Sequence, residues 1–176
     1  MEFRLEQSME ILERTPAVLD GLLRGLSGEW IRGNEGLETW SPFDVLGHLI
    51  HGARTDWMPR LHFILEYGAS RPFDRFDRFA IFHESQGKTA DELLDLFAGL
   101  RRACLRALHN LKLAPDDFKR RGSHPELGVV TLGQLVATWA AHDLDHLCQI
   151  ARVIAWQYAA ATGPWSAYLG AITRPL

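Results

Sequence analysis

The chain has only two cysteines among its 176 residues, Cys104 and Cys148. Both fall inside helical patterns and far from any Cys-x-x-Cys spacing, which argues against the usual cysteine-based zinc and redox motifs. Cys148 follows His146 by two positions, so on a helix it points to nearly the opposite side and suits no shared metal site. We therefore expect two buried free thiols, as in proteins of a reducing cytosol.

Long hydrophobic runs are also missing. No apolar stretch approaches the roughly 20 residues that a membrane-spanning helix needs. The start, Met1 to Glu6, lacks the apolar core of a signal peptide. These absences predict a soluble cytoplasmic protein without a membrane partner.

Charge of one sign is not in excess either. The 19 Lys and Arg and the 22 Asp and Glu give a net charge of -3 at pH 7, so we expect no nucleic-acid partner. No nucleotide-binding loop and no Ser-His-Asp arrangement is visible. A hydrophobic content of 47% is typical of globular chains, and the length predicts one domain over residues 1–176.

Helical patterns dominate what is present. Apolar periodicity predicts long helices over residues 2–26, 42–67, 89–110 and 131–160, and a short terminal helix over 165–172. Pro16 and Pro59 predict a kink or break in the first two helices. Residues 28–36, 68–88 and 110–130 are expected to be loops, and nothing alternates with the period of a strand. The predicted fold is therefore all-α, a four-helix bundle with a short C-terminal helix.

Local signals support these helices. Three of them begin with capping residues: Ser41-Pro42 with Asp44, Thr89 with Glu92, and Thr131 with Gln134. The loop over 68–88 is unusually long for a compact domain. Its phenylalanines, Phe73, Phe76, Phe79 and Phe82, are expected to cover one end of the core or to close over a pocket.

Two histidines four residues apart are the most informative pattern. His142 and His146 leave the same face of the fourth helix. They continue an apolar seam with these members: Leu132, Leu135, Trp139, Ile150 and Val153. Two imidazoles buried in such a seam cost free energy unless their nitrogens are satisfied, and a divalent metal ion would satisfy them.

A third ligand is expected on the second helix, where His48 and His51 are candidates. The two side chains are rotated by about 60° from each other at 3.6 residues per turn. Helical periodicity alone gives little reason to choose one of them as the ligand. His48 has the more apolar neighbours, which favours it slightly.

The sequence resembles the DinB-like superfamily of metal-dependent four-helix-bundle proteins. The resemblance rests on Trp40-Ser41-Pro42 through Gly47-His48-Leu49, on the loop 123–128, and on Thr131-Leu132-Gly133-Gln134 leading to the His142-x-x-x-His146 pair. It implies an up-down-down-up helix order and one divalent ion, zinc or nickel, held by His48, His142 and His146. Some relatives use low-molecular-weight thiols in S-transfer or maleylpyruvate isomerisation, and relatives are frequently dimers.

Several further residues have two interpretations. Asp143 and Asp145 would accept hydrogen bonds from metal-bound histidines, or be solvated surface charges, which is slightly favoured. Gln149 would contact a metal-bound water or substrate, or hydrogen-bond another helix. His124 would approach the site or form a turn, and the turn is favoured. The remaining residues are expected away from the chemistry, as surface histidines or core tryptophans: His62, His83, His109, Trp57 and Trp139.

The three histidines predict an enzyme with an open metal position that acts on a small molecule. The resemblance implies that its reaction is thiol-dependent S-transfer or hydrolysis. No residue is identified as a general base, so the catalytic residues beyond the metal ligands are unassigned. The alternative is a non-catalytic metal-binding bundle with a structural or stress-sensing role. Six tryptophans and nine phenylalanines exceed what a small bundle can bury, and with the resemblance they predict a homodimer.

Overall fold

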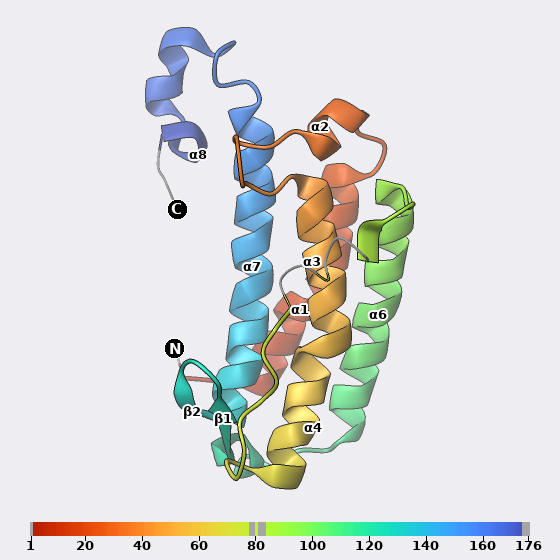
Figure 1. Ribbon diagram of the computed structural model, residues 1–176, viewed down its shortest axis with the longest axis vertical. Coiled ribbons are helices and arrows are strands. Elements are labelled where there is room, and N and C mark those ends of the chain that lie inside the picture. Colours follow the sequence, from red (N-terminus) through yellow and green to blue (C-terminus); the bar gives the residue numbers. More distant parts are fainter. Residues whose placement is uncertain (1, 78–79, 81–83, 174–176) are drawn as a thin grey trace.

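Four long helical segments form a bundle in the computed structural model, which describes residues 2–77, 80 and 84–173 (Figure 1). They are α1 (Leu5–Leu23), α3 (Pro42–Thr55) continued by α4 (Trp57–Tyr67), α6 (Ala90–Asn110) and α7 (Leu132–Trp156). In Figure 1, α1 and α7 run upward while α3–α4 and α6 run downward. The predicted all-α four-helix bundle with its up-down-down-up order is confirmed. Each of α1 and α3 packs against both α6 and α7.

The helix starts follow the capping residues. Capping boxes are present at all three predicted positions: Ser41 with Asp44, Thr89 with Glu92, and Thr131 with Gln134. In each box a hydroxyl accepts from the backbone N–H three residues on, and the side chain there accepts from the capping residue's own N–H. The start of α3 is thereby fixed two turns before His48.

Helix α1 is not broken at Pro16, although a kink or break was predicted there. A proline has no N–H to donate to the carbonyl four residues earlier, which here belongs to Leu12. That carbonyl instead accepts a hydrogen bond of 3.0 Å from Nη1 of Arg101 on α6. The neighbouring helix thus replaces the bond that the proline removes.

The second predicted helix is interrupted, as Pro59 suggested. Helix α3 ends at Thr55 and α4 begins at Trp57, with Asp56 between them. The ring of Pro59 conflicts with the carbonyl of Thr55 four residues earlier, while its missing N–H does no harm in the first turn of α4. The break places Asp56 and Trp57 beside the centre of the bundle.

Two predicted loops contain regular structure. A short helix, α2 (Gly28–Arg32), lies within 28–36. An antiparallel hairpin of β1 (Arg121–His124) and β2 (Gly128–Thr131) follows the 3-10 helix η1 (Asp117–Lys119); it begins within 110–130 and ends one residue beyond it. Four-residue strands are too short to show alternation. Contacts with the bundle hold the hairpin in place: a Cβ on Gly122 would lie 2.7 Å from Ile64 Cγ1 and 2.8 Å from Phe73 Cζ.

The loop over 68–88 is tied to this hairpin. The backbone N–H of Phe73 donates to the carbonyl of Ser123 at 2.9 Å, and the Phe73 ring is buried in the core. Phe76 lies further up, beside the histidines. One phenylalanine therefore covers the core and the other lines a pocket, while Phe79 and Phe82 lie outside the described residues.

The C-terminal end and the cysteines depart from expectation. Helix α7 ends at Trp156, four residues early, and is followed by the 3-10 segment η2 (Gly163–Tyr168) and the short α8 (Gly170–Thr173). Cys148 is exposed and Cys104 is half-buried, so the expected burial of both thiols is wrong for Cys148. No helix within the described residues has the length and apolar character to cross a membrane.

The core surrounds the middle of the bundle. Trp57 and Trp139 are both buried and stack with their ring centroids 5.7 Å apart and planes 6° apart. The predicted burial of both in the core is confirmed, but Trp57 is not away from the predicted metal site, because it lies against His142. The Trp57 ring packs on His142 with 5.0 Å between the ring centroids and 70° between the planes, so the packed core supports the first of the paired histidines.

Candidate metal centre

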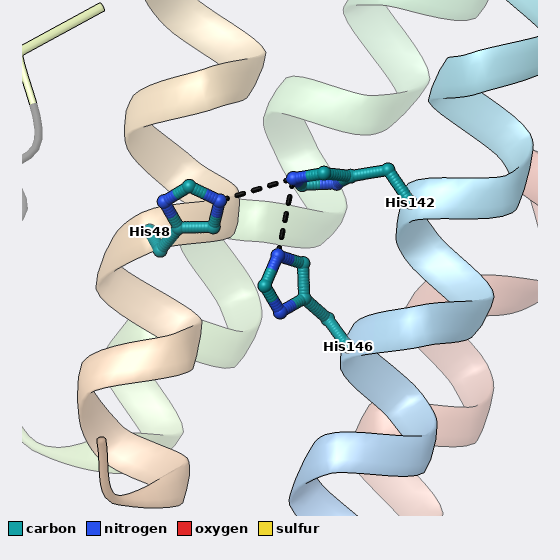
Figure 2. Close-up of side chains that lie close together, drawn as sticks. All are labelled: His48, His142 and His146. Carbon is teal, nitrogen blue, oxygen red and sulfur yellow. Dashed lines mark hydrogen bonds between the residues drawn. The ribbon is translucent and has the colours of Figure 1, made fainter. Parts of the chain in front are cut away.

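Three histidines converge between α3 and α7. Nε2 of His142 lies 3.0 Å from Nε2 of His48 and 3.1 Å from Nε2 of His146. Figure 2 shows His48 on α3 directed toward His142 and His146, which lie one turn apart on α7. They form a group that could hold a metal ion, with ligand atoms within 4.8 Å of one another. The residues that the sequence singled out are therefore brought together.

His51, the alternative on the second helix, lies elsewhere. Its side chain is buried, with Nε2 3.3 Å from the hydroxyl of Thr55 and Nδ1 3.8 Å from Glu84. The ring of Phe76 contacts both His48 and His51, at 5.4 and 5.0 Å between centroids. His51 thus lies behind Phe76, outside the group of three.

Burial keeps the imidazoles of α7 neutral. The pKa of His142 is lowered from 6.5 to about 3, mainly by burial and in addition by the nearby His146, His48 and Arg101. The pKa of His146 is also lowered by burial, against the opposing effect of its hydrogen bond with Gln149. Near neutral pH both rings keep an unprotonated nitrogen, which a metal ligand requires.

Gln149 sets the orientation of His146. Its Oε1 lies 2.7 Å from Nδ1 of His146, and a carbonyl oxygen can only accept, so Nδ1 carries the proton. Nε2 then presents its lone pair to the other two histidines. Of the two roles considered for Gln149 from sequence, the hydrogen bond to another helix is replaced by one to a histidine of its own helix.

The donor set suits a divalent ion. Nitrogens that bind one ion at about 2.0–2.1 Å lie about 2.9 Å apart at right angles and about 3.4 Å apart in a tetrahedron. The two separations from Nε2 of His142, 3.0 Å to His48 and 3.1 Å to His146, fall within that range. Among the described residues no fourth His, Cys, Asp or Glu joins the group. An ion held there would keep coordination positions for other molecules.

Asp143, which follows His142 in the chain, is buried, which corrects the favoured view of it as a solvated charge. It is 0% exposed and forms a two-pronged ion pair with Arg101, whose Nη1 and Nη2 donate to its two oxygens. Phe97 and Trp139 flank the guanidinium. Asp145, in contrast, is exposed as expected. The residue after His142 therefore forms a buried salt bridge that joins α7 to α6.

A cavity of about 350 Å³ opens beside the histidines. Aromatic rings surround its inner end: Trp40 is 5.0 Å and Phe76 5.4 Å from the His48 ring, and Trp57 packs on His142. Such rings exclude water and leave an apolar wall around the polar nitrogens. Trp40 was not predicted from the sequence to line a cavity, although it directly precedes the capping Ser41 of α3.

The outer end of the cavity is polar. Asp56 and Arg60 line it from the α3–α4 break, and His124 and Glu126 line it from the hairpin. Burial raises the pKa of the Asp56 carboxyl, and the positive charge of Arg60 opposes that shift. Asp56 and Arg60 were not among the site residues predicted from the sequence; their spacing of four and eight residues from Gly52 was the available signal.

The remaining histidines follow expectation where they are described. His124 forms a turn, because its Nδ1 accepts from the backbone N–H groups of Glu126 and Leu127, both at 3.2 Å. It also borders the cavity. His62 and His109 are exposed, and His83 lies outside the described residues.

Comparisons with known proteins agree with this arrangement. A sequence profile of the DinB superfamily matches residues 11–150. The solved structure of YfiT from Bacillus subtilis matches with a TM-score of 0.73 and 18% identity, over 90% of this chain and 87% of its own. YfiT is described as a probable metal-dependent hydrolase with an unusual four-helix bundle topology, and at this identity the likeness shows the fold. The curated proteins contain no significant match.

Proposed function

Because this chain belongs to the DinB superfamily and gathers three histidines at the wall of a cavity, we propose that it is a metal-dependent enzyme. His48, His142 and His146 hold one divalent ion, zinc or nickel. The observation that carries this proposal is the convergence of their three Nε2 atoms. Zinc and nickel both accept imidazole ligands.

Such an ion supplies Lewis acidity, which lowers the pKa of a water or thiol that binds beside the imidazoles. The chain provides the rest. Gln149 fixes the His146 ring, the stack of Trp57 on Trp139 supports His142, and Trp40 and Phe76 shield the nitrogens from bulk water. A small molecule in the cavity is thereby held against the three histidines.

Two reactions suit this centre, hydrolysis and thiol-dependent S-transfer. The description of YfiT as a probable metal-dependent hydrolase supports the first. The resemblance to thiol-using relatives supports the second, with a low-molecular-weight thiol as co-substrate. The two differ in the nucleophile, water or a thiol, and share the metal, the imidazoles and the cavity.

The alternative is a non-catalytic metal-binding bundle with a structural or sensing role. Structural zinc sites are normally closed by four protein ligands. The described residues supply three, and these three line a cavity of about 350 Å³. Both observations favour catalysis over a structural role.

The first test is metal content. We expect about one divalent ion per chain in the purified protein and a loss of most of it in His142→Ala, His146→Ala and His48→Ala, because two imidazoles bind far more weakly than three. His51→Ala is the matched control, since it removes a buried histidine one turn from His48 without touching the group. Full metal content in the α7 variants, or loss in His51→Ala alone, contradicts the ligand assignment.

The second test separates the reactions. Metal-loaded protein is assayed with ester and amide substrates, and with electrophilic substrates in the presence of glutathione, bacillithiol or mycothiol. We expect turnover in one class, abolished by a chelator and by His142→Ala, and restored to the wild type by zinc or nickel. A metal-loaded protein inactive with both classes supports the non-catalytic alternative.

A further inference from the structure

One face of α3 and α4 leads away from the histidines along the cavity. His48, Gly52, Asp56 and Arg60 follow one another at intervals of four residues, so they share a face of the two helices. All four line the cavity. Asp56 comes eight residues after His48, a rise of about 12 Å along a helix. The cavity therefore joins the three histidines to a second, charged end.

Arg60 is held in a fixed position at that end. Its Nε donates to Asp56 Oδ1 at 2.6 Å, and its side chain is 13% exposed. The guanidinium lies over the ring of Phe73, 5.2 Å from the centroid. Asp56 makes no capping hydrogen bond to the start of α4, although an aspartate at that position usually does. Its carboxylate serves Arg60 instead.

The two Nη atoms of Arg60 are not fully used as hydrogen-bond donors. Its Nη2 reaches the carbonyl of Asp74 at only 3.5 Å, a weak contact, and within the described residues Nη1 has no hydrogen-bond partner. Arg75 lines the same cavity from the loop after α4. It is exposed and forms no ion pair with any described residue. Arg60 and Arg75 thus both line this end, where the cavity adjoins a second one of about 280 Å³ that the same two arginines also line. Neither guanidinium has all its N–H groups taken by acceptors of the described residues.

The charges around the cavity favour an anion once a metal is bound. Arg60 and Arg75 are balanced by Asp56, which is engaged by Arg60, and by the exposed Glu126. With neutral imidazoles, a divalent ion adds two positive charges to a nearly balanced cavity. An arginine fork matches a carboxylate with two parallel hydrogen bonds. A carboxylate near Arg60 would supply the missing acceptors.

We propose that the cavity binds small molecules with the reacting group at one end and a carboxylate at the other, and that Arg60 recognises the carboxylate with help from Arg75. The proposal rests on the metal-dependent function above and names its substrate class. Asp56 acts as a positioning residue, because it orients Arg60. Arg60 and Arg75 then determine specificity rather than perform chemistry.

Matched probes test this without knowledge of the substrate. The probes are straight-chain dicarboxylic acids of several lengths with one end converted to a hydroxamate, which chelates the ion, and the other left as carboxylate or converted to a carboxamide. We expect calorimetry on zinc-loaded protein to show tighter binding of the carboxylate probe, by about tenfold to a hundredfold at the best length. Equal affinity of the two probes in the wild type overturns the proposal.

Variants locate the recognition. Arg60→Gln should abolish most of the carboxylate preference, Arg60→Lys should retain part of it while keeping the pair with Asp56, and Arg75→Gln should reduce it. Arg54→Gln is the control, because Arg54 pairs with Glu84 outside this cavity. The carboxamide probe should bind all of them equally, which shows that the metal centre is intact. A preference that survives in Arg60→Gln and Arg75→Gln combined overturns the proposal. If the wild-type protein binds no metal, the proposed metal-dependent function is contradicted, and not only the carboxylate recognition. Elemental analysis of the wild type distinguishes the two cases.

Discussion

At the scale of single residues, His142 is the most perturbed group of the centre. Its pKa is about 3 in the folded chain against 6.5 for an ordinary histidine. The unfolded chain therefore takes up a proton below pH 6.5 that the folded chain refuses until about pH 3. Stability contributed by the neutral ring is present above pH 6.5 and is lost as the pH falls.

We therefore predict that the metal-free protein loses about 2 kcal/mol of unfolding free energy through His142 alone between about pH 7.5 and about pH 5. Urea unfolding at the two pH values measures it. His142→Leu is the reference. Because it lacks the titrating group, its unfolding free energy should fall by about 2 kcal/mol less over the same pH range. An identical pH dependence in the two proteins would contradict the depressed pKa.

The ion pair of Arg101 and Asp143 gives a second prediction. Both side chains are almost completely buried, so removing one charge leaves the other without compensation. Asp143→Asn should cost about 3–5 kcal/mol of unfolding free energy. Asp145→Asn, on an exposed position two residues away, should change it by less than about 0.5 kcal/mol. Chemical denaturation compares the two, and similar effects would show that the pair contributes little.

At the scale of elements, features that depend on residues close in sequence could be predicted, and features that depend on tertiary contacts could not. The starts of α3, α6 and α7 were predictable because a capping box involves residues three apart. The His142 and His146 pair was predictable for the same reason, since one helical turn joins them. Arg101 and Asp143, 42 residues apart, carry no local pattern. The ring of Phe76 comes from a loop whose path depends on the hairpin.

The position of the hairpin also depends on tertiary contacts, and these contacts give a third prediction. Gly122 lies so close to Ile64 and Phe73 that a Cβ would approach atoms of both within 2.8 Å. Gly122→Ala should therefore destabilise the protein by about 1–3 kcal/mol. Gly21→Ala on α1, where a Cβ meets nothing within 4 Å, should be neutral or stabilising by up to about 1 kcal/mol. Thermal unfolding of both variants decides, and equal melting temperatures would refute the close packing.

At the scale of the whole molecule, large side chains beyond α7 remain uncovered. They are Tyr158, Trp165 and Tyr168, exposed by 58%, 72% and 84%. Apolar groups that gather on a surface often mark an interface. They support the proposal that the protein is a homodimer, most simply with two-fold symmetry.

Light scattering at micromolar concentration tests the proposed dimer. Two chains of 19.9 kDa each give a mass of about 40 kDa. Trp165→Glu combined with Tyr168→Glu should shift the mass toward that of one chain, because charges at an apolar interface are costly. A wild-type mass near 20 kDa that does not rise with concentration rejects the dimer.

The hydrogen bond between Arg101 and the carbonyl of Leu12 links two positions that are distant in sequence and bears on how related chains diverge. Pro16 leaves that carbonyl without its helical partner, and Arg101 supplies the replacement while it also engages Asp143. A lineage that lost Arg101 first would leave both the Leu12 carbonyl and the Asp143 carboxylate buried without a hydrogen-bond partner. Replacement of Pro16 by a residue with an N–H would remove only the first of these constraints. Substitutions at 16, 101 and 143 should therefore be inherited as a correlated set, with the proline free to change before the arginine.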